Sequence, residues 1–288
     1  MFRKSIILSL FVCAFQYSYA QNTDSLTFVK SKWIKKSIGS KSKLITHHFA
    51  DKNLFGANQN ISYIEIKNLK KKGYIAIGQE VKILKPTSKF GRDLNALAAV
   101  NGTFFDIKNG GSVDLIKTNG LINAQNRIEN GGGRSAHQQA AIAISNGLLD
   151  IKKWDGSENW ESNLAAEDIM VSGPLLRINN KDEKIDSGSF SITRHPRTAV
   201  GIAGNKVIIL TVDGRHENSA GMSLFELSKI MKWLGCSASI NLDGGGSTTM
   251  WVHGFGDTGV VNYPSDNKKW DHNGERNVAN VILLKKKP

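Results

Sequence analysis

The sequence has 288 residues, which is long enough for one large domain. Hydrophobic residues make up 40% and charged residues 22% of the chain, proportions that exclude a disordered protein or a fibrous repeat. The formal net charge of +13 favours anionic partners, without choosing among nucleic acid, phosphorylated sugars and a membrane surface.

The first twenty residues, Met1–Ala20, have the pattern of a secretory signal peptide. Basic residues come first, and the apolar run from Ile6 to Phe15 is too short to cross a bilayer. Small residues then precede Gln21, where we expect cleavage. An uncleaved anchor is the alternative, and a lipoprotein at Cys13 is disfavoured by the valine before it. We therefore expect an exported periplasmic or extracellular protein without a later transmembrane segment.

Cleavage would leave Cys236 as the single thiol. An exported chain with one thiol has neither an internal disulfide nor a cysteine metal site. We interpret Cys236 as a small buried apolar residue rather than a nucleophile.

Short apolar or alternating runs typical of strands recur along the mature chain. They cover residues 61–67, 73–78, 94–100, 140–144, 169–171, 206–212 and 238–242. The polar, glycine-containing stretch 107–136 is predicted to be a loop or hairpin over the site. We expect a single α+β domain with a mixed many-stranded sheet and few helices. Residues 21–90 would pack on or lead into a catalytic domain over residues 91–288.

One strand-helix-strand unit is especially clear. The run Lys206–Val212 has strand length, and Ser223 followed by Glu226 forms a capping-box pattern at the start of a helix. Apolar residues then recur at helical spacing until Gly235, and Ala238–Leu242 follows as a second strand. If the two strands are parallel, the unit carries the candidate site at the edge where both strands end.

Asp213 and Asp243 directly follow these two strands, and each precedes glycine. Paired carboxylates suit acid/base catalysis, a positively charged sugar transition state or a hard metal ion. The alternative is that both are turn residues, since Asp-Gly is a common turn pair. The segment Gly244-Gly245-Gly246-Ser247 after Asp243 predicts a nest of backbone N–H groups that could hold a phosphate.

Basic residues near this unit are candidates for binding a phosphate. Arg197 and Arg215 could each grip phosphate oxygens through the planar guanidinium group. His195 is a candidate substrate contact or proton carrier, although a single histidine is also a common structural residue.

Six short motifs in this order resemble the phosphodiester glycosidase family over about residues 90–285. They are Asn101-Gly102-Thr103-Phe104-Phe105, Ser172-Gly173-Pro174-Leu175-Leu176, Arg197-Thr198-Ala199-Val200-Gly201, Val212-Asp213-Gly214-Arg215, Gly221-Met222-Ser223-Leu224-Phe225-Glu226-Leu227, and Asn241-Leu242-Asp243-Gly244-Gly245-Gly246-Ser247-Thr248-Thr249-Met250.

The resemblance implies a hydrolase that cleaves the sugar C1–O bond of a sugar-1-phosphodiester, such as one of N-acetylglucosamine. It implies a catalytic set and further substrate contacts within the motifs. The catalytic set would be Asp213, Asp243, Arg197 and Arg215, and the substrate contacts would be Asn101, Phe104, Ser172, Gly173, His195, Glu226, Gly244, Gly245, Gly246 and Ser247.

Two other functions stay open from the sequence. One is a non-catalytic module that binds anionic surface glycans, and the other is a metal-dependent phosphodiesterase that breaks the P–O bond. No cofactor is required by the pattern, although Asp243 could hold a divalent cation. A nucleic-acid partner is not expected, because no recognised binding motif is present. The sequence leaves the oligomeric state open.

Overall fold

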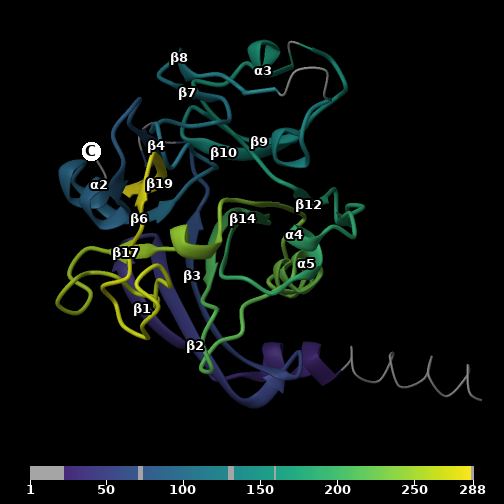
Figure 1. The fold of residues 1–288 in the computed structure, drawn as a ribbon, viewed down its shortest axis with the longest axis vertical. Helices are drawn as coiled ribbons and strands as arrows, with labels where there is room; N and C mark the ends of the chain where they lie inside the picture. The colour runs from purple at the N-terminus through teal and green to yellow at the C-terminus, as the bar shows by residue number, and fades with distance from the viewer. Residues whose placement is uncertain (1–22, 71–73, 129–132, 159, 287–288) are drawn as a thin grey trace, which may run out of the picture.

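The computed structural model in Figure 1 describes residues 23–70, 74–128, 133–158 and 160–286. Strands dominate these residues, and the few helices are short. The predicted single-domain α+β fold is confirmed. The strands are divided among an eight-stranded, a five-stranded, a four-stranded and a two-stranded sheet, and the eight-stranded one corresponds to the many-stranded sheet that was expected. The proposed signal peptide lies outside the described residues.

The eight-stranded sheet contains the predicted strand-helix-strand unit. Its strands, in spatial order, are β1 (Ile34–Gly39), β2 (Ser42–Leu54), β3 (Ala57–Lys67), β15 (Lys206–Val212), β14 (Arg197–Ala203), β16 (Ala238–Asn241), β12 (Leu175–Ile178) and β13 (Lys181–Asp182). Neighbouring strands are antiparallel, so β15 and β16 run parallel to each other on either side of β14.

The remaining strands form three smaller sheets. One contains β10 (Leu148–Lys153), β9 (Ala140–Ser145), β11 (Asp168–Ser172), β7 (Ile116–Thr118) and β8 (Leu121–Ala124). Another contains β17 (Met250–Val252), β6 (Ala96–Asn101), β19 (Asn280–Lys285) and β4 (Ile75–Gln79), and β18 (Asn277–Val278) pairs with β5 (Lys85–Pro86). The stretch 107–136 thus contributes the β7–β8 hairpin to a sheet.

Helical segments connect and cover these sheets. They are residues 23–30, α2 (Thr87–Asp93), α3 (Trp160–Asn163), α4 (Ser189–Ile192) and α5 (Leu224–Trp233), with 3₁₀ turns η1 (Ala136–Gln138) and η2 (Gly245–Ser247). Among the described residues, no helix has the length and apolar character needed to cross a membrane.

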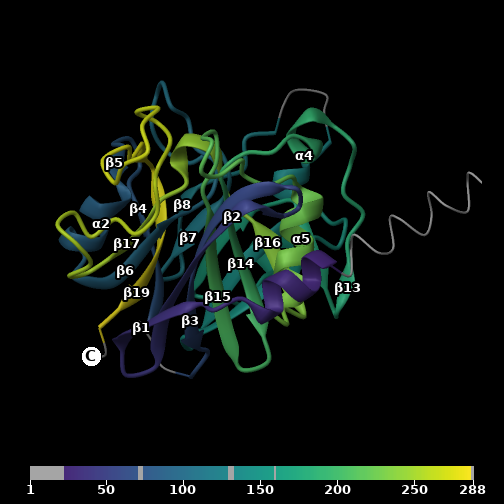
Figure 2. The same ribbon diagram turned by 90° about the horizontal axis from the view of Figure 1, so that it is seen from below.

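The middle of the eight-stranded sheet is buried on both faces, which explains why the sequence of β15 is continuously apolar. Ile208 and Leu210 pack in the cluster that includes Ile230 of α5. Val207 and Ile209 point the other way, into the cluster shared with the smaller sheets. Figure 2 shows α5 on one side of the sheet and β6 and β19 on the opposite side. Each such side chain contributes roughly 1.5–3 kcal/mol by burial.

The helix α5 begins at the predicted capping box. The Glu226 N–H donates to Ser223 Oγ at 3.2 Å, and the Ser223 N–H donates to Glu226 Oε2 at 2.9 Å. The helix packs closely on β14, because a Cβ on Gly201 would lie 2.6 Å from Cε of Met231, a residue of α5. Cys236 is only 2% exposed, and burial raises the pKa of its thiol to about 12. This environment is that of a structural cysteine.

Candidate active site

The sheet order brings three of the predicted residues to one edge of the eight-stranded sheet. Arg197 begins β14 opposite Val212, the last residue of β15. Asp213 follows β15, and Asp243 comes two residues after β16 ends. Because β14 runs antiparallel to both neighbours, its first residue lies where β15 and β16 end.

A surface cavity of about 230 Å³ opens at this edge. It is lined by Phe190, His195, Arg197, Arg215, Asp243, Gly244, Gly245, Gly246 and Arg276. One carboxylate therefore faces three guanidinium groups in a small polar cavity. Such a charge distribution suits an anion next to a site where positive charge develops.

Arg197 is buried in the cavity wall without a carboxylate partner among the described residues. Its Nε donates to the Met222 carbonyl at 2.8 Å, and its Nη2 donates to the carbonyls of Phe190 at 2.6 Å and Thr193 at 3.0 Å. Burial, and secondarily the charge of Arg215, lowers the pKa of Arg197 to about 10. The guanidinium stays charged at neutral pH and would gain from a bound anion.

The other two arginines approach the glycine segment. Arg215 is exposed, has a φ of 63°, and would have its Nη2 2.9 Å from a Cβ on Gly245. Arg276 donates from Nε to Asp266 Oδ1 at 2.9 Å, and a Cβ on Gly246 would lie 2.4 Å from its Nη2. Glycine is therefore needed here so that the arginines can lie over the backbone.

The glycine segment does not form the predicted nest of free N–H groups. The Gly244 N–H donates to Asp243 Oδ1 at 2.9 Å, and the Gly245 N–H donates to the Pro196 carbonyl at 2.8 Å. The Ser247 N–H donates to the Gly244 carbonyl at 3.2 Å. Since these donors are used within the chain, the arginines rather than the loop amides supply the main attraction for an anion.

Asp243 is the carboxylate that lines the cavity. Burial raises its pKa to about 6, although Ser247, the Gly244 N–H and Arg276 act in the opposite direction. Its backbone is fixed by β6, because Asn101 Nδ2 donates to the Asp243 carbonyl at 2.7 Å and the Asp243 N–H donates to the Gly102 carbonyl at 3.1 Å. At neutral pH the side chain is an available base or nucleophile.

Asp213 lies behind the cavity and does not line it. It is 1% exposed, and its carboxylate accepts from Asn60 Nδ2 at 2.7 Å, Asn262 Nδ2 at 2.8 Å and the Tyr263 N–H at 3.0 Å. Burial raises the pKa of Asp213 as well. A carboxylate saturated in this way fits a positioning role for the loop that carries Arg215, in place of the direct catalytic role we expected.

Four other residues that were predicted to contact substrate instead form hydrogen bonds within the chain. Asn101 and Ser172 are buried, and the Ser172 hydroxyl donates to the Asn241 carbonyl at 3.1 Å. Gly173 accepts from Asn241 Nδ2 at 2.9 Å, and Glu226 is engaged by the capping box and by Arg194 Nε at 3.1 Å. None of the four lines the described cavity, because each is used to hold a strand or helix end.

The two remaining predicted contacts and Ser247 lie closer to the cavity. His195 lines it, and burial followed by the charges of Arg197 and Arg215 lowers the pKa of this histidine. Phe104 does not line the cavity but contacts Phe190 in its wall, with the two ring centroids 6.2 Å apart. Ser247 is the last residue of the turn η2 and is completely buried.

The sequence prediction missed Phe190 and Arg276, which both line the cavity. Phe190 also stacks under Arg197, with the guanidinium carbon 4.8 Å from the ring centroid. Neither residue belongs to a strand-end motif: Phe190 lies in the short helix α4, and Arg276 lies in an irregular segment before β18. Only the charge of Arg276 could have served as a signal.

No group of three or more His, Cys, Asp or Glu side chains is placed to hold a metal ion in the described parts of the chain. Asp243 meets arginines rather than other carboxylates in the cavity. The described residues therefore offer no ready set of ligands for the divalent cation considered from the sequence.

Residues 94–285, two thirds of the chain, match the phosphodiester glycosidase family. The chain belongs to the phosphodiester glycosidase family, a family of hydrolases. This match covers nearly the same region as the six motifs.

Individual relatives agree with the family assignment. Mouse N-acetylglucosamine-1-phosphodiester alpha-N-acetylglucosaminidase is 26% identical over 178 residues, which are 58% of this chain and 33% of the mouse protein. An uncharacterized SPbeta prophage-derived protein of Bacillus subtilis is 32% identical over 87 residues, 25% of this chain and 14% of that protein. The matched region thus spans about a third or less of these relatives.

Solved structures show the same fold. The catalytic domain of the zebrafish N-acetylglucosamine-1-phosphodiester alpha-N-acetylglucosaminidase, auto-inhibited by its pro-peptide, superposes with a TM-score of 0.65 at 20% identity, covering 88% of both chains. A hypothetical protein from Synechocystis gives a TM-score of 0.57 at 15% identity, covering 88% of this chain and 63% of that one.

Proposed function

We propose that this protein hydrolyses the sugar C1–O bond of a sugar-1-phosphodiester and releases the free sugar and a phosphomonoester. The observation that carries the proposal is the single carboxylate, Asp243, facing Arg197, Arg215 and Arg276 in one cavity. The reaction needs this pairing, because positive charge develops at C1 while negative charge develops on the departing phosphate.

The arginines would bind the phosphodiester and stabilise the leaving group. A phosphomonoester has a second pKa of about 6, so it can depart without full protonation at neutral pH. Charge neutralisation is then the main requirement. Arg197 suits it because its guanidinium is fixed by three carbonyls before substrate arrives.

Asp243 would act at the sugar. As a carboxylate it can stabilise the positive charge at C1, attack that carbon, or accept a proton from the hydrolytic water. Asn101 and Asp213 support the site indirectly in this proposal. The first holds the backbone of Asp243, and the second holds the loop that carries Arg215, because the Asp213 carbonyl accepts from Ser219 Oγ.

The sugar class is proposed from the names of the mouse and zebrafish relatives, which specify N-acetylglucosamine-1-phosphodiesters. Met1–Ala20 supports export, with cleavage before Gln21. A cell-surface or extracellular glycan phosphodiester is therefore the proposed substrate class. No nucleic-acid partner is part of the proposal.

A product assay in ¹⁸O-labelled water tests the reaction. The purified protein lacking residues 1–20 is incubated with a panel of sugar-1-phosphodiesters, with and without a chelator. We expect ¹⁸O in the released sugar and no effect of the chelator. Label in the phosphate would instead identify P–O cleavage, and binding without any product would identify a glycan-binding module.

A further inference from the structure

We propose that His137, oriented by Asp114, is the base that accepts a proton from the water attacking C1. This inference rests on the proposed hydrolysis and assigns one of its open roles. The sequence motifs include neither residue, and neither lines the arginine cavity directly.

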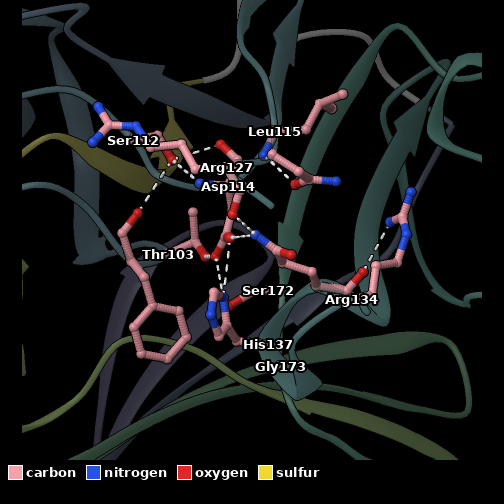
Figure 3. A network of polar contacts seen from close by, with 12 residues as sticks. Thr103, Ser112, Asp114, Leu115, Arg127, Arg134, His137, Ser172 and Gly173 are labelled. Carbon is pink, nitrogen blue, oxygen red and sulfur yellow. Dashed lines mark hydrogen bonds and ion pairs between the residues drawn. The ribbon is translucent and has the colours of Figure 1, made fainter. Parts of the chain in front are cut away.

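Asp114 is a completely buried carboxylate at the centre of a polar network. His137 Nδ1 lies 3.0 Å from both of its oxygens, and Thr103 Oγ1 and Gln138 Nε2 each donate to it at 3.1 Å (Figure 3). Within the described residues, His137 is the only ionisable side chain bonded to Asp114. Burying a carboxylate without an arginine or lysine partner is costly, which points to a specific use.

The contact with Asp114 fixes how the imidazole is protonated. A carboxylate accepts a hydrogen bond, so Nδ1 carries the proton and Nε2 keeps its lone pair. The His137 side chain is 31% exposed. Nε2 has no partner among the described residues and is absent from their buried unpaired atoms, so this nitrogen reaches solvent. An oriented imidazole with an accessible lone pair is the arrangement of a general base.

Two connections place this pair beside the cavity. The carbonyl of Gly102 accepts from the Asp243 N–H, and the next residue, Thr103, bonds Asp114. The charge of Asp114 accordingly helps to raise the pKa of Asp243.

On its other side, His137 contacts aromatic rings that lead into the cavity. Its centroid is 4.9 Å from that of Phe104, which in turn contacts Phe190 in the cavity wall. The nearby charges are those of Asp114, of Asp243 and of the Arg134–Glu161 ion pair. This ion pair lies beyond Gln138, whose carbonyl accepts from Arg134 Nη1 at 3.0 Å.

The step balances without another reactant. The water oxygen forms a bond to C1 while one water proton moves to His137 Nε2. The C1–O bond breaks, and its electron pair leaves with the phosphomonoester, which the arginines stabilise. The protonated imidazole keeps its Nδ1–H bond to Asp114 and then returns the Nε2 proton to solvent. Asp243 is left to stabilise the positive sugar carbon.

The test compares His137→Ala with the matched control His253→Ala, which removes an exposed histidine elsewhere. We expect His137→Ala to lower kcat by about 10²–10⁴-fold with little change in KM, and added imidazole to restore part of it. The control should retain wild-type kcat. His137→Asn, which keeps a donor toward Asp114, should be as inactive and melt like the wild type. Full kcat in either His137 variant, or no rescue by imidazole, would overturn the assignment.

A binding experiment separates this inference from the proposed function. Histidine NMR signals are followed while the methyl phosphodiester of N-acetylglucosamine 1-phosphate is added to the inactive Asp243→Asn variant. A shift of the His137 signal, absent for His253, is expected. Binding that leaves His137 unaffected would contradict its role even if the hydrolysis is correct. Activity lost in Asp243→Asn but kept in His137→Ala would likewise reject only this inference.

Discussion

At the scale of single residues, the cavity combines charged groups whose burial costs desolvation free energy. Arg197 is buried against carbonyl groups, and Asp243 is held ionised at neutral pH although burial favours its neutral form. Both costs would be offset when a phosphodiester and a positive transition state bind. The loss of folding stability caused by these two buried charges therefore indicates a functional site.

The pKa of Asp243 predicts how activity depends on pH. Because the proposed mechanism requires the ionised form, kcat/KM should fall about tenfold for each pH unit below about 6. Asp243→Asn should lose about 10²–10⁴-fold in kcat at neutral pH. A pH series with the wild type measures the first effect. A kcat/KM that is flat from neutral to about pH 5 would contradict the assignment.

The raised pKa of Asp243 affects folding stability in the opposite direction from activity, because this group stabilises the folded state more at low pH. A carboxyl group with a pKa of about 6 when folded, against about 4 when unfolded, binds protons better in the folded state. Its contribution to stability is full below about pH 4 and is lost as the pH rises through 6. Asp243→Asn should therefore unfold at a higher temperature than the wild type at pH 7, by the equivalent of about 3 kcal/mol, since each pKa unit corresponds to about 1.4 kcal/mol. Equal melting temperatures at pH 7 would contradict this prediction.

Arg197 and Arg215 should respond differently to replacement by lysine. Arg197→Lys leaves buried carbonyls unpaired and loses the guanidinium fork, so it should lower the free energy of unfolding by about 1–3 kcal/mol and reduce kcat/KM. Arg215→Lys, at an exposed position, is the matched control and should alter stability by less than about 0.5 kcal/mol. Equal stability losses in urea titrations would refute the distinction.

At the scale of elements, α5 and the two strands around it were the most predictable part of the fold. The capping box, the helical spacing and the apolar strands are local signals, and each matches an observed element. The strand β14 between β15 and β16 was not predictable, because insertion of a strand between two others depends on long-range pairing. The strand β1 was missed because most of it is exposed, which leaves no apolar pattern to read.

The capping box can be tested without disturbing the site. Ser223→Ala removes the acceptor for the Glu226 N–H and should lower the free energy of unfolding by about 0.5–2 kcal/mol. Turnover should stay at the wild-type level, because Ser223 does not line the cavity. Chemical unfolding and a kinetic assay check the two parts. A large loss of kcat with unchanged stability would mean that Ser223 has a direct role.

At the scale of the whole molecule, the six motifs were enough to indicate the family, and Arg197, Arg215, Asp243 and the glycines do meet at one cavity. The sequence could not separate cavity residues from supporting ones. Asp213 and Asp243 have the same local pattern, yet only the second faces the cavity. The difference arises from Asn60 and Asn262, which are distant in sequence and saturate Asp213.

The single buried thiol offers a measure of opening of the whole fold. Cys236 is 2% exposed, so in the chain that begins at Gln21 a thiol reagent should react only when the structure around α5 opens. Labelling should be negligible in the native protein and complete in denaturant, with Cys236→Ala as the blank. Fast labelling of the native protein would show that this region opens readily.

The amide of Asn101 links the end of β6 to the residue that performs the proposed chemistry, which is carried by a different sheet. The position of the Asp243 carboxylate therefore depends on two sheets and on how they pack against each other. A small displacement of one sheet relative to the other would misorient the Asp243 side chain in the cavity, while nearly all hydrophobic contacts of the core stayed in place. Enzymatic activity should accordingly be lost at a lower denaturant concentration than the one at which circular dichroism detects unfolding.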